Sequence, residues 1–147
     1  MADISMNSLS TDDTQRELID HFAFFDNWED RYRYLIDLGR KLPVFPDEWR
    51  TEEFRIKGCQ SQVWFHPEFS NNTLHFQAIS DAAIVSGLIY LLLQVYSNRT
   101  PQDILATEPT FIDAIGFTQF LSPSRSNGLA HMLAAIKNYA LHYQQQH

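Results

Sequence analysis

Residues 80–96 read SDAAIVSGLIYLLLQVY, and we expect this stretch to decide the fold. Ser80 and Asp81 are typical capping residues, so a helix is predicted over 82–96. Apolar side chains occur nearly all the way round this helix, at Ile84, Val85, Leu88, Ile89, Leu91, Leu92, Leu93 and Val95. A helix that is apolar on every face is normally buried, so this segment is predicted to form the centre of the domain.

Before this helix, the sequence has the period of β-strands. Apolar and polar residues alternate in three short runs, at 54–56, 63–65 and 74–78. Asn71-Asn72 lies between the second and third runs and predicts a hairpin turn, because asparagine tolerates left-handed backbone conformations. The expected sheet is therefore small, three-stranded and antiparallel.

Further helices are predicted on both sides of this core. Residues 11–14 supply N-cap candidates for a first helix, and a second is expected over 28–39. After the central helix, short helices are expected from Pro101 and over 109–120, and a last helix follows Ser122. The fold class is therefore α+β, with a small three-stranded antiparallel sheet packed against several helices.

The composition is typical of a folded protein. The 147 residues are 44% hydrophobic and 20% charged, and no repeat or low-complexity linker divides them. We predict a single domain over 1–147, with residues 1–10 poorly ordered. The acidic start carries no secretory signal, and the longest apolar run, 87–93, is too short to span a bilayer. A single cysteine favours a reducing compartment, so a cytoplasmic protein without a membrane partner is expected.

The net charge of −7 disfavours a nucleic-acid partner, because such binding needs clustered lysine and arginine. The charge is nevertheless uneven, since seven of the eleven basic residues fall between positions 31 and 57. This segment has two interpretations. It either forms a locally basic face near Cys59 or, with its interleaved acidic residues, an ordinary solvated helix surface, which we prefer.

The only cysteine, Cys59, is placed on the loop between the first two predicted strands. Gly58 permits a positive φ there, and Gln60 and Ser61 can donate hydrogen bonds to an anionic sulfur. Lys57 would lower the pKa of the thiol if its side chain faced the sulfur. This setting favours an accessible, reactive thiol over a buried and inert one.

Three reaction classes are open to such a thiol. A cysteine-dependent hydrolase needs a histidine base and an oxyanion hole, and none of the six histidines lies in a recognisable signature. A structural metal site or an iron–sulfur scaffold needs several ligands, and this chain has one cysteine. Sulfur exchange needs only one nucleophilic sulfur that attacks a partner's persulfide or disulfide, so it fits best.

Several blocks of the sequence resemble the SufE family of sulfur-acceptor proteins. The most specific block is GCQSQVW at 58–64. The others, in the order of the family, are NWEDRY at 27–32, LIDLG at 35–39, SDAAIV at 80–85, TPQDI at 100–104 and LSPSRSNGL at 121–129. The similarity covers roughly residues 15–140. It implies the fold shared with IscU-type scaffold proteins, an antiparallel sheet packed on helices.

The resemblance also implies a role for Cys59. Family members accept sulfane sulfur from the persulfide of a pyridoxal-phosphate cysteine desulfurase, stimulate that enzyme and pass the sulfur to iron–sulfur cluster assembly. The implied partners are a SufS-like desulfurase and a downstream iron–sulfur scaffold complex. The pyridoxal phosphate belongs to the desulfurase, and no cofactor or metal is expected in this chain. The protein is then an accessory in sulfur transfer rather than a stand-alone enzyme, and a homodimer is left open.

Alternatives accompany this interpretation. An iron–sulfur scaffold is the rival function, and a CsdE-type acceptor for a different sulfur pathway is the alternative within the family. Arg125 is expected near Cys59, where it stabilises a thiolate or persulfide or contacts the desulfurase; an ordinary surface arginine is the competing interpretation. Asp81 lies in a family block, but capping of the central helix is its preferred explanation. Finally, an apolar pocket is predicted to shelter Cys59 until the partner docks.

Overall fold

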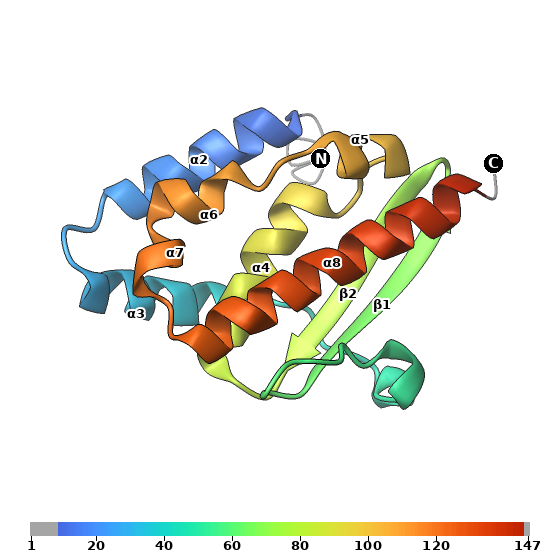
Figure 1. Cartoon of the computed structure of the whole chain (residues 1–147), viewed down its shortest axis with the longest axis horizontal. Coiled ribbons are helices and arrows are strands. Elements are labelled where there is room, and N and C mark those ends of the chain that lie inside the picture. Colours follow the sequence, from blue (N-terminus) through green and yellow to red (C-terminus); the bar gives the residue numbers. More distant parts are fainter. Residues whose placement is uncertain (1–8, 146–147) are drawn as a thin grey trace.

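The computed structural model describes residues 9–145, in which helices pack on a two-stranded antiparallel sheet (Figure 1). The helices are α2 (Thr11–Ala23), α3 (Trp28–Gly39), α4 (Ala83–Tyr96), α5 (Pro101–Ala106), α6 (Thr110–Ile115), α7 (Phe117–Phe120) and α8 (Pro123–Gln145). Short 3-10 turns at Asp47–Trp49 and Glu52–Phe54 precede the strands β1 (Val63–Ser70) and β2 (Thr73–Ser80). Figure 1 shows α4 between the strands and the group formed by α2, α3, α6 and α7, while α8 runs along the molecule from beside α7 to the hairpin end of the strands.

The central position of α4 is confirmed. Its side chains are buried on several faces, and those with 0–1% exposure are Leu88, Ile89, Leu91, Leu92, Val95 and Tyr96. The helix contacts α2, α3, α8 and β2. Because most faces of α4 are apolar, each of these neighbours removes apolar surface from water, and the other elements are arranged around it.

The three-stranded sheet is not confirmed. Residues 54–56 pair with β1 only through an isolated antiparallel bridge between Arg55 and Trp64. A 3-10 turn occupies the chain just before this bridge, and Gly58, at φ 90°, turns it away just after. The alternation in the sequence has another cause: Ile56 enters the core at 7% exposure, whereas Phe54 packs edge-on against His66 on the opposite side of the sheet.

The hairpin is present as predicted. Its turn residues Asn71 and Asn72 have positive φ values of 52° and 64°. In the register, Phe65 pairs with Ala78, and these inward residues are almost fully buried. The opposite face of β1 is covered by the segment before it, where Trp49 stacks on His66 with ring centroids 3.4 Å apart.

Two other predictions are refined by the structure. The single helix expected over 109–120 is divided into α6 and α7 by Gly116, which adopts a left-handed conformation with φ 104°. The prediction of poor order over 1–10 falls mainly on residues 1–8, which lie outside the described residues. Ser10 accepts a hydrogen bond from the Asp13 amide and caps α2. Over residues 9–145, we find no helix that combines the length and the apolar character required to cross a membrane.

Two glycines allow α3 and α4 to approach closely. A Cβ atom at residue 87 would lie 2.2 Å from the Leu35 carbonyl oxygen, and one at Gly39 would lie 2.7 Å from the Gly87 nitrogen. Both contacts involve backbone atoms, which cannot rotate away as a flexible side chain can. The packing of α4 on α3 therefore depends on the absence of side chains at these positions.

We expect Gly87→Ala to lower the free energy of unfolding by about 2 kcal/mol or more, although alanine is about 1 kcal/mol better than glycine in an open helix. The reason is the clash with the α3 backbone. Urea unfolding measures the change. The control is Gln94→Ala on the same helix, at a partly exposed position, which should change stability by about 0.5 kcal/mol or less. Equal stabilities of the wild type and Gly87→Ala would contradict the predicted close contact.

Candidate functional site

Cys59 lies in a cavity of about 190 Å³ that three distant segments of the chain enclose. The loop before β1, the start of α4 and the first turns of α8 each supply part of the wall. The lining residues are Cys59, Gln60, Ser61, Ala82, Val85, Ser124, Arg125, Gly128 and Met132. The predicted shelter for the thiol is therefore present, but its wall combines apolar and polar side chains rather than being apolar throughout.

The thiol is directed at α8. Cys59 Sγ donates a hydrogen bond to the carbonyl oxygen of Gly128, at 3.7 Å. Gly128 is buried, and a Cβ atom there would lie 3.7 Å from the sulfur, an ordinary contact distance. The half-buried position raises the pKa of the Cys59 thiol, because burial disfavours the charged thiolate. This conformation therefore favours the protonated thiol over the thiolate.

Lys57 does not lower the pKa of the thiol. Its ammonium group forms an ion pair with Glu52 at 3.5 Å, and its side chain is 78% exposed. The electrostatic effect expected from the neighbouring position is absent, and burial instead raises the pKa of Cys59. Lys57 lines a different cavity from the one that contains Cys59.

Arg125 and Cys59 line the same cavity although they are 66 positions apart in the sequence. The Arg125 amide donates to Ser122 Oγ at 3.3 Å, which anchors the first turn of α8. The residue as a whole is exposed, so its guanidinium group is accessible to solvent and to a docking partner. Gln60 and Ser61 line the cavity from the loop, and Ser124 adds a hydroxyl from α8.

Asp81 anchors the Cys59 loop instead of capping α4. Its carboxylate accepts a hydrogen bond from the Gln62 amide at 3.1 Å, and its own amide donates to the Gln62 carbonyl at 3.3 Å. The N-cap of α4 is Ala82, which has no side-chain capping bond. The predicted cap is therefore wrong. The sequence could not indicate the true partner, because β1 and β2 must first pair to bring residues 62 and 81 together.

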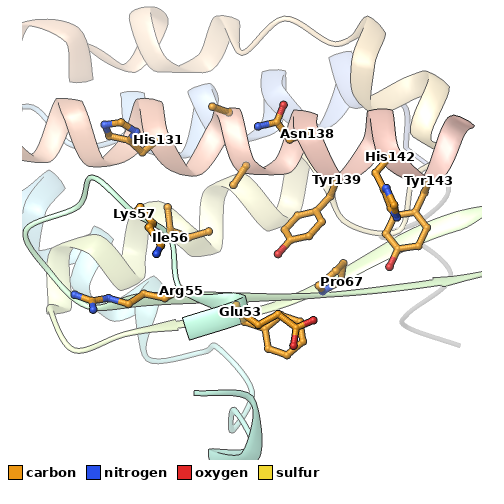
Figure 2. Close-up of a pocket in the computed structure, with 13 residues that line it drawn as sticks. Glu53, Arg55, Ile56, Lys57, Pro67, His131, Asn138, Tyr139, His142 and Tyr143 are labelled. Carbon is orange, nitrogen blue, oxygen red and sulfur yellow. The ribbon is translucent and has the colours of Figure 1, made fainter. Parts of the chain in front are cut away.

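His131 was not predicted as a site residue, yet it contacts the loop at Gly58. A Cβ atom at Gly58 would lie 2.5 Å from Nε2 of the imidazole. His131 also lines a larger groove of about 650 Å³, bounded by residues 53–57, Pro67 and the second half of α8. Figure 2 shows α8 along one side of this groove, with Tyr139 pointing into it.

The basic segment forms no unbalanced basic face. Five of its cations have carboxylate partners within 3.5 Å, in the pairs Arg33–Asp30, Arg40–Asp37, Arg50–Asp47, Arg55–Glu52 and Lys57–Glu52. These exposed pairs contribute little to stability but neutralise the segment locally. The preferred interpretation, a solvated surface, agrees with this arrangement. Within residues 9–145, no three or more His, Cys, Asp or Glu side chains are grouped so as to hold a metal ion.

The raised pKa of Cys59 predicts a pH-dependent contribution to stability. A thiol with a higher pKa in the folded state contributes stability that is complete below its unfolded pKa and is lost as the pH rises through the folded pKa. The ordinary value is 9.0. We therefore expect the Tm of the wild type, relative to that of Cys59→Ser, to fall as the pH rises past about 9. Parallel Tm profiles of the two proteins would contradict burial of the thiol.

The hydrogen bond between Asp81 and Gln62 predicts which amides lose protection when Asp81 is replaced. In Asp81→Ala, the Gln62 amide loses its acceptor, so its hydrogen exchange should accelerate by about tenfold, whereas the amides of α4 keep their protection. Exchange followed by NMR measures both effects. Asp81→Asn keeps an oxygen acceptor and is the matched control. Loss of protection in the first turn of α4 would instead support the capping role.

Comparisons with known proteins agree with these features. The sequence model of SufE, described as an Fe-S metabolism associated domain, matches residues 16–140. An uncharacterized SufE-like protein of Rhizobium meliloti strain 1021 is 42% identical over 134 residues, covering 84% of this chain and 92% of that protein. One from Rhizobium etli is 43% identical over 129 residues, covering 84% of this chain and 87% of the relative.

The fold has a solved counterpart. The solution structure of a hypothetical protein from Thermus thermophilus superimposes with a TM-score of 0.74, covering 90% of this chain and 96% of the other. At 20% identity, this likeness concerns the α+β fold alone. The family match extends over most of the chain and includes every residue that lines the Cys59 cavity. The chain therefore belongs to the SufE family, whose domain is associated with iron–sulfur metabolism.

Proposed function

We propose that the protein accepts sulfane sulfur on Cys59 from the persulfide of a cysteine desulfurase, stimulates that enzyme and delivers the sulfur to iron–sulfur cluster assembly. The observation that carries this proposal is the single cysteine of a SufE-family chain, held on a loop in a small cavity with polar side chains around it. Sulfur exchange requires only one nucleophilic sulfur on this side of the reaction. The cavity supplies a protected place for that sulfur.

The transfer step balances without a further oxidant or reductant. The Cys59 thiol loses its proton, and the thiolate attacks the terminal sulfur of the partner's persulfide. The new S–S bond forms as the partner's S–S bond breaks, and the electron pair of the broken bond stays on the partner's cysteine sulfur. That sulfur takes up the proton. The products are a Cys59 persulfide and a free partner cysteine.

The observed position of Cys59 favours protection over attack. Its thiol is half-buried, has a raised pKa and is hydrogen-bonded to a backbone carbonyl, whereas the attacking species is the thiolate. The loop must therefore leave the cavity for the sulfur to reach a partner's active site. The chain is thus an accessory in sulfur transfer, which acts only in a complex with the desulfurase.

The cavity can also accommodate the product. Its volume is about 190 Å³, and a water molecule in the liquid occupies about 30 Å³, so one added sulfur atom fits. Polar groups of Gln60, Ser61 and Ser124 line it and can solvate an anionic persulfide. Arg125 supplies the positive charge that favours the anion. A persulfide withdrawn into this cavity is shielded from reductants in solution.

The partners follow from this chemistry. The donor is a SufS-like desulfurase that carries the pyridoxal phosphate, and the receiver is an iron–sulfur scaffold complex in the same cytoplasmic compartment. This chain contributes the sulfur-carrying cysteine and its cavity, and it uses no cofactor of its own.

Sulfur acceptance is tested by intact-mass measurement. The protein is incubated with a SufS-like desulfurase and free cysteine, and a gain of one or more sulfur atoms is expected on the wild type. Cys59→Ser should gain none, because the accepting atom is absent. A wild-type protein that gains no sulfur from its cognate enzyme would overturn the proposal. Iron bound to the purified protein would favour the scaffold function instead.

Arg125→Ala tests the charge in the cavity. We expect the amount of persulfide retained on Cys59 after removal of the desulfurase to fall by about tenfold, because a charge-assisted hydrogen bond contributes about 1.5–3 kcal/mol. Arg16→Ala, an exposed arginine on α2 paired with Asp13, is the matched control and should behave as the wild type. If Arg125→Ala accepts and retains sulfur normally, Arg125 is an ordinary surface residue.

A further inference from the structure

Two residues of α8, three positions apart, contact two consecutive residues of the Cys59 loop. Gly128 accepts the hydrogen bond from the Cys59 thiol, and His131 lies against Gly58. Residues at this spacing lie on the same face of a helix, so the loop packs against one face of α8. Gly128, which has no side chain, faces Cys59, and the larger His131 faces Gly58.

The contact at Gly58 is unusually close. A Cβ atom on this residue would lie 2.5 Å from Nε2, 2.6 Å from Cε1 and 2.7 Å from Cδ2 of His131. Real Cβ atoms do not approach heavy atoms so closely, so the imidazole occupies the space that a side chain at residue 58 would need. A side chain at residue 58 would therefore be disfavoured by the φ of 90° and would also displace the imidazole of His131.

We propose that His131 is a positioning residue that holds the Cys59 loop in its retracted conformation. The imidazole packs over Gly58, and the adjacent Cys59 is thereby seated on Gly128 inside the cavity. Only the biological purpose of this contact, the release of the sulfur at the right time, rests on the proposed function. The seating of the loop is a property of the isolated protein and is tested on it directly.

The surroundings of His131 allow this contact to open. The residue is exposed and lines the groove of about 650 Å³, next to Lys57 and Ile56 (Figure 2). An imidazole that rotates toward this groove would uncover Gly58 without disturbing the buried side of α8, where Met132 and Ile136 are packed. The hold is therefore a surface contact that a docking protein can displace by occupying the groove or moving the ring.

The anchors of the loop define the part that can move. Before Gly58, the Ile56 amide donates to the Val63 carbonyl oxygen at 2.9 Å, and Ile56 is buried. After Cys59, the Gln62 amide donates to the Asp81 carboxylate. Residues 57–61 lie between these anchors, and His131 packs on Gly58 within this segment.

The test measures how fast iodoacetamide alkylates Cys59 in the isolated protein. Alkylation through transient opening follows the population of the open loop, so His131→Ala should react about tenfold faster than the wild type. His131→Phe restores a ring over Gly58 and should return the rate toward that of the wild type. Asn138→Ala, at an exposed position on α8 that lines the same groove, is the matched control and should leave the rate unchanged.

A double-mutant cycle separates the contact from the backbone strain. Gly58→Ala introduces both the clash and an unfavourable φ, and should also accelerate alkylation. In the His131→Ala background the clash is gone, so the added effect of Gly58→Ala should be smaller than in the wild type. Thermal unfolding of each variant shows whether the fold is retained. His131→Ala should still unfold cooperatively, with a Tm only a few degrees below that of the wild type, because it loses one surface contact of the closed loop.

Each of these measurements can contradict the proposal. An unchanged rate in His131→Ala, a rate in His131→Phe equal to that of the alanine variant, or fully additive effects of the two substitutions would overturn the proposal. With a desulfurase, His131→Ala should lower the apparent KM for this protein without changing kcat. The reason is that docking of the desulfurase must release the loop, and in this variant the release costs less free energy. Failure of the wild type to accept sulfur would overturn the proposed function alone, since the alkylation rates still report on the loop.

Discussion

The burial of most of α4 is the constraint on which the rest of the structure depends. Each large apolar side chain removed from water stabilises the fold by about 1.5–3 kcal/mol, and only a narrow stripe of this helix, which includes Gln94, stays partly exposed. The remaining faces need neighbours, and α2, α3, α8 and β2 provide them. Gly39 and Gly87 let α3 approach to backbone contact, which leaves α4 little freedom to shift.

The position of α4 also determines part of the Cys59 cavity. Its first turn supplies Ala82 and Val85 to the cavity, and α8 crosses close enough to supply the opposite wall. The Cys59 loop closes the remaining side, anchored to residue 81 just before the helix. The geometry of this surface loop thus depends on the buried central helix, which supplies one wall of the cavity around the thiol.

The proposed function sets two opposing requirements for the site. A sulfur carrier must react readily with its partner and slowly with everything else. Burial raises the pKa of the Cys59 thiol and disfavours the reactive thiolate, which fits the second requirement. In our proposal, the first is met when the loop moves, because the thiol then regains contact with water and its pKa returns toward the ordinary range. A polar loop with a glycine beside the cysteine is suited to this change because its exposed state costs little.

The amino-acid sequence was sufficient to predict the buried central helix, the hairpin at Asn71-Asn72, the α+β class and the SufE family, because these depend on local periodicity, turn chemistry and specific motifs. The third strand was predicted wrongly, since alternation cannot distinguish a paired strand from a segment whose side chains enter two different layers. The raised pKa of Cys59, the partner of Asp81, the ion pair of Lys57 and the contact of His131 with Gly58 could be found only in the folded chain. Each of these arises between residues that are distant in sequence or free to choose a direction, and packing around α4 sets those distances and directions.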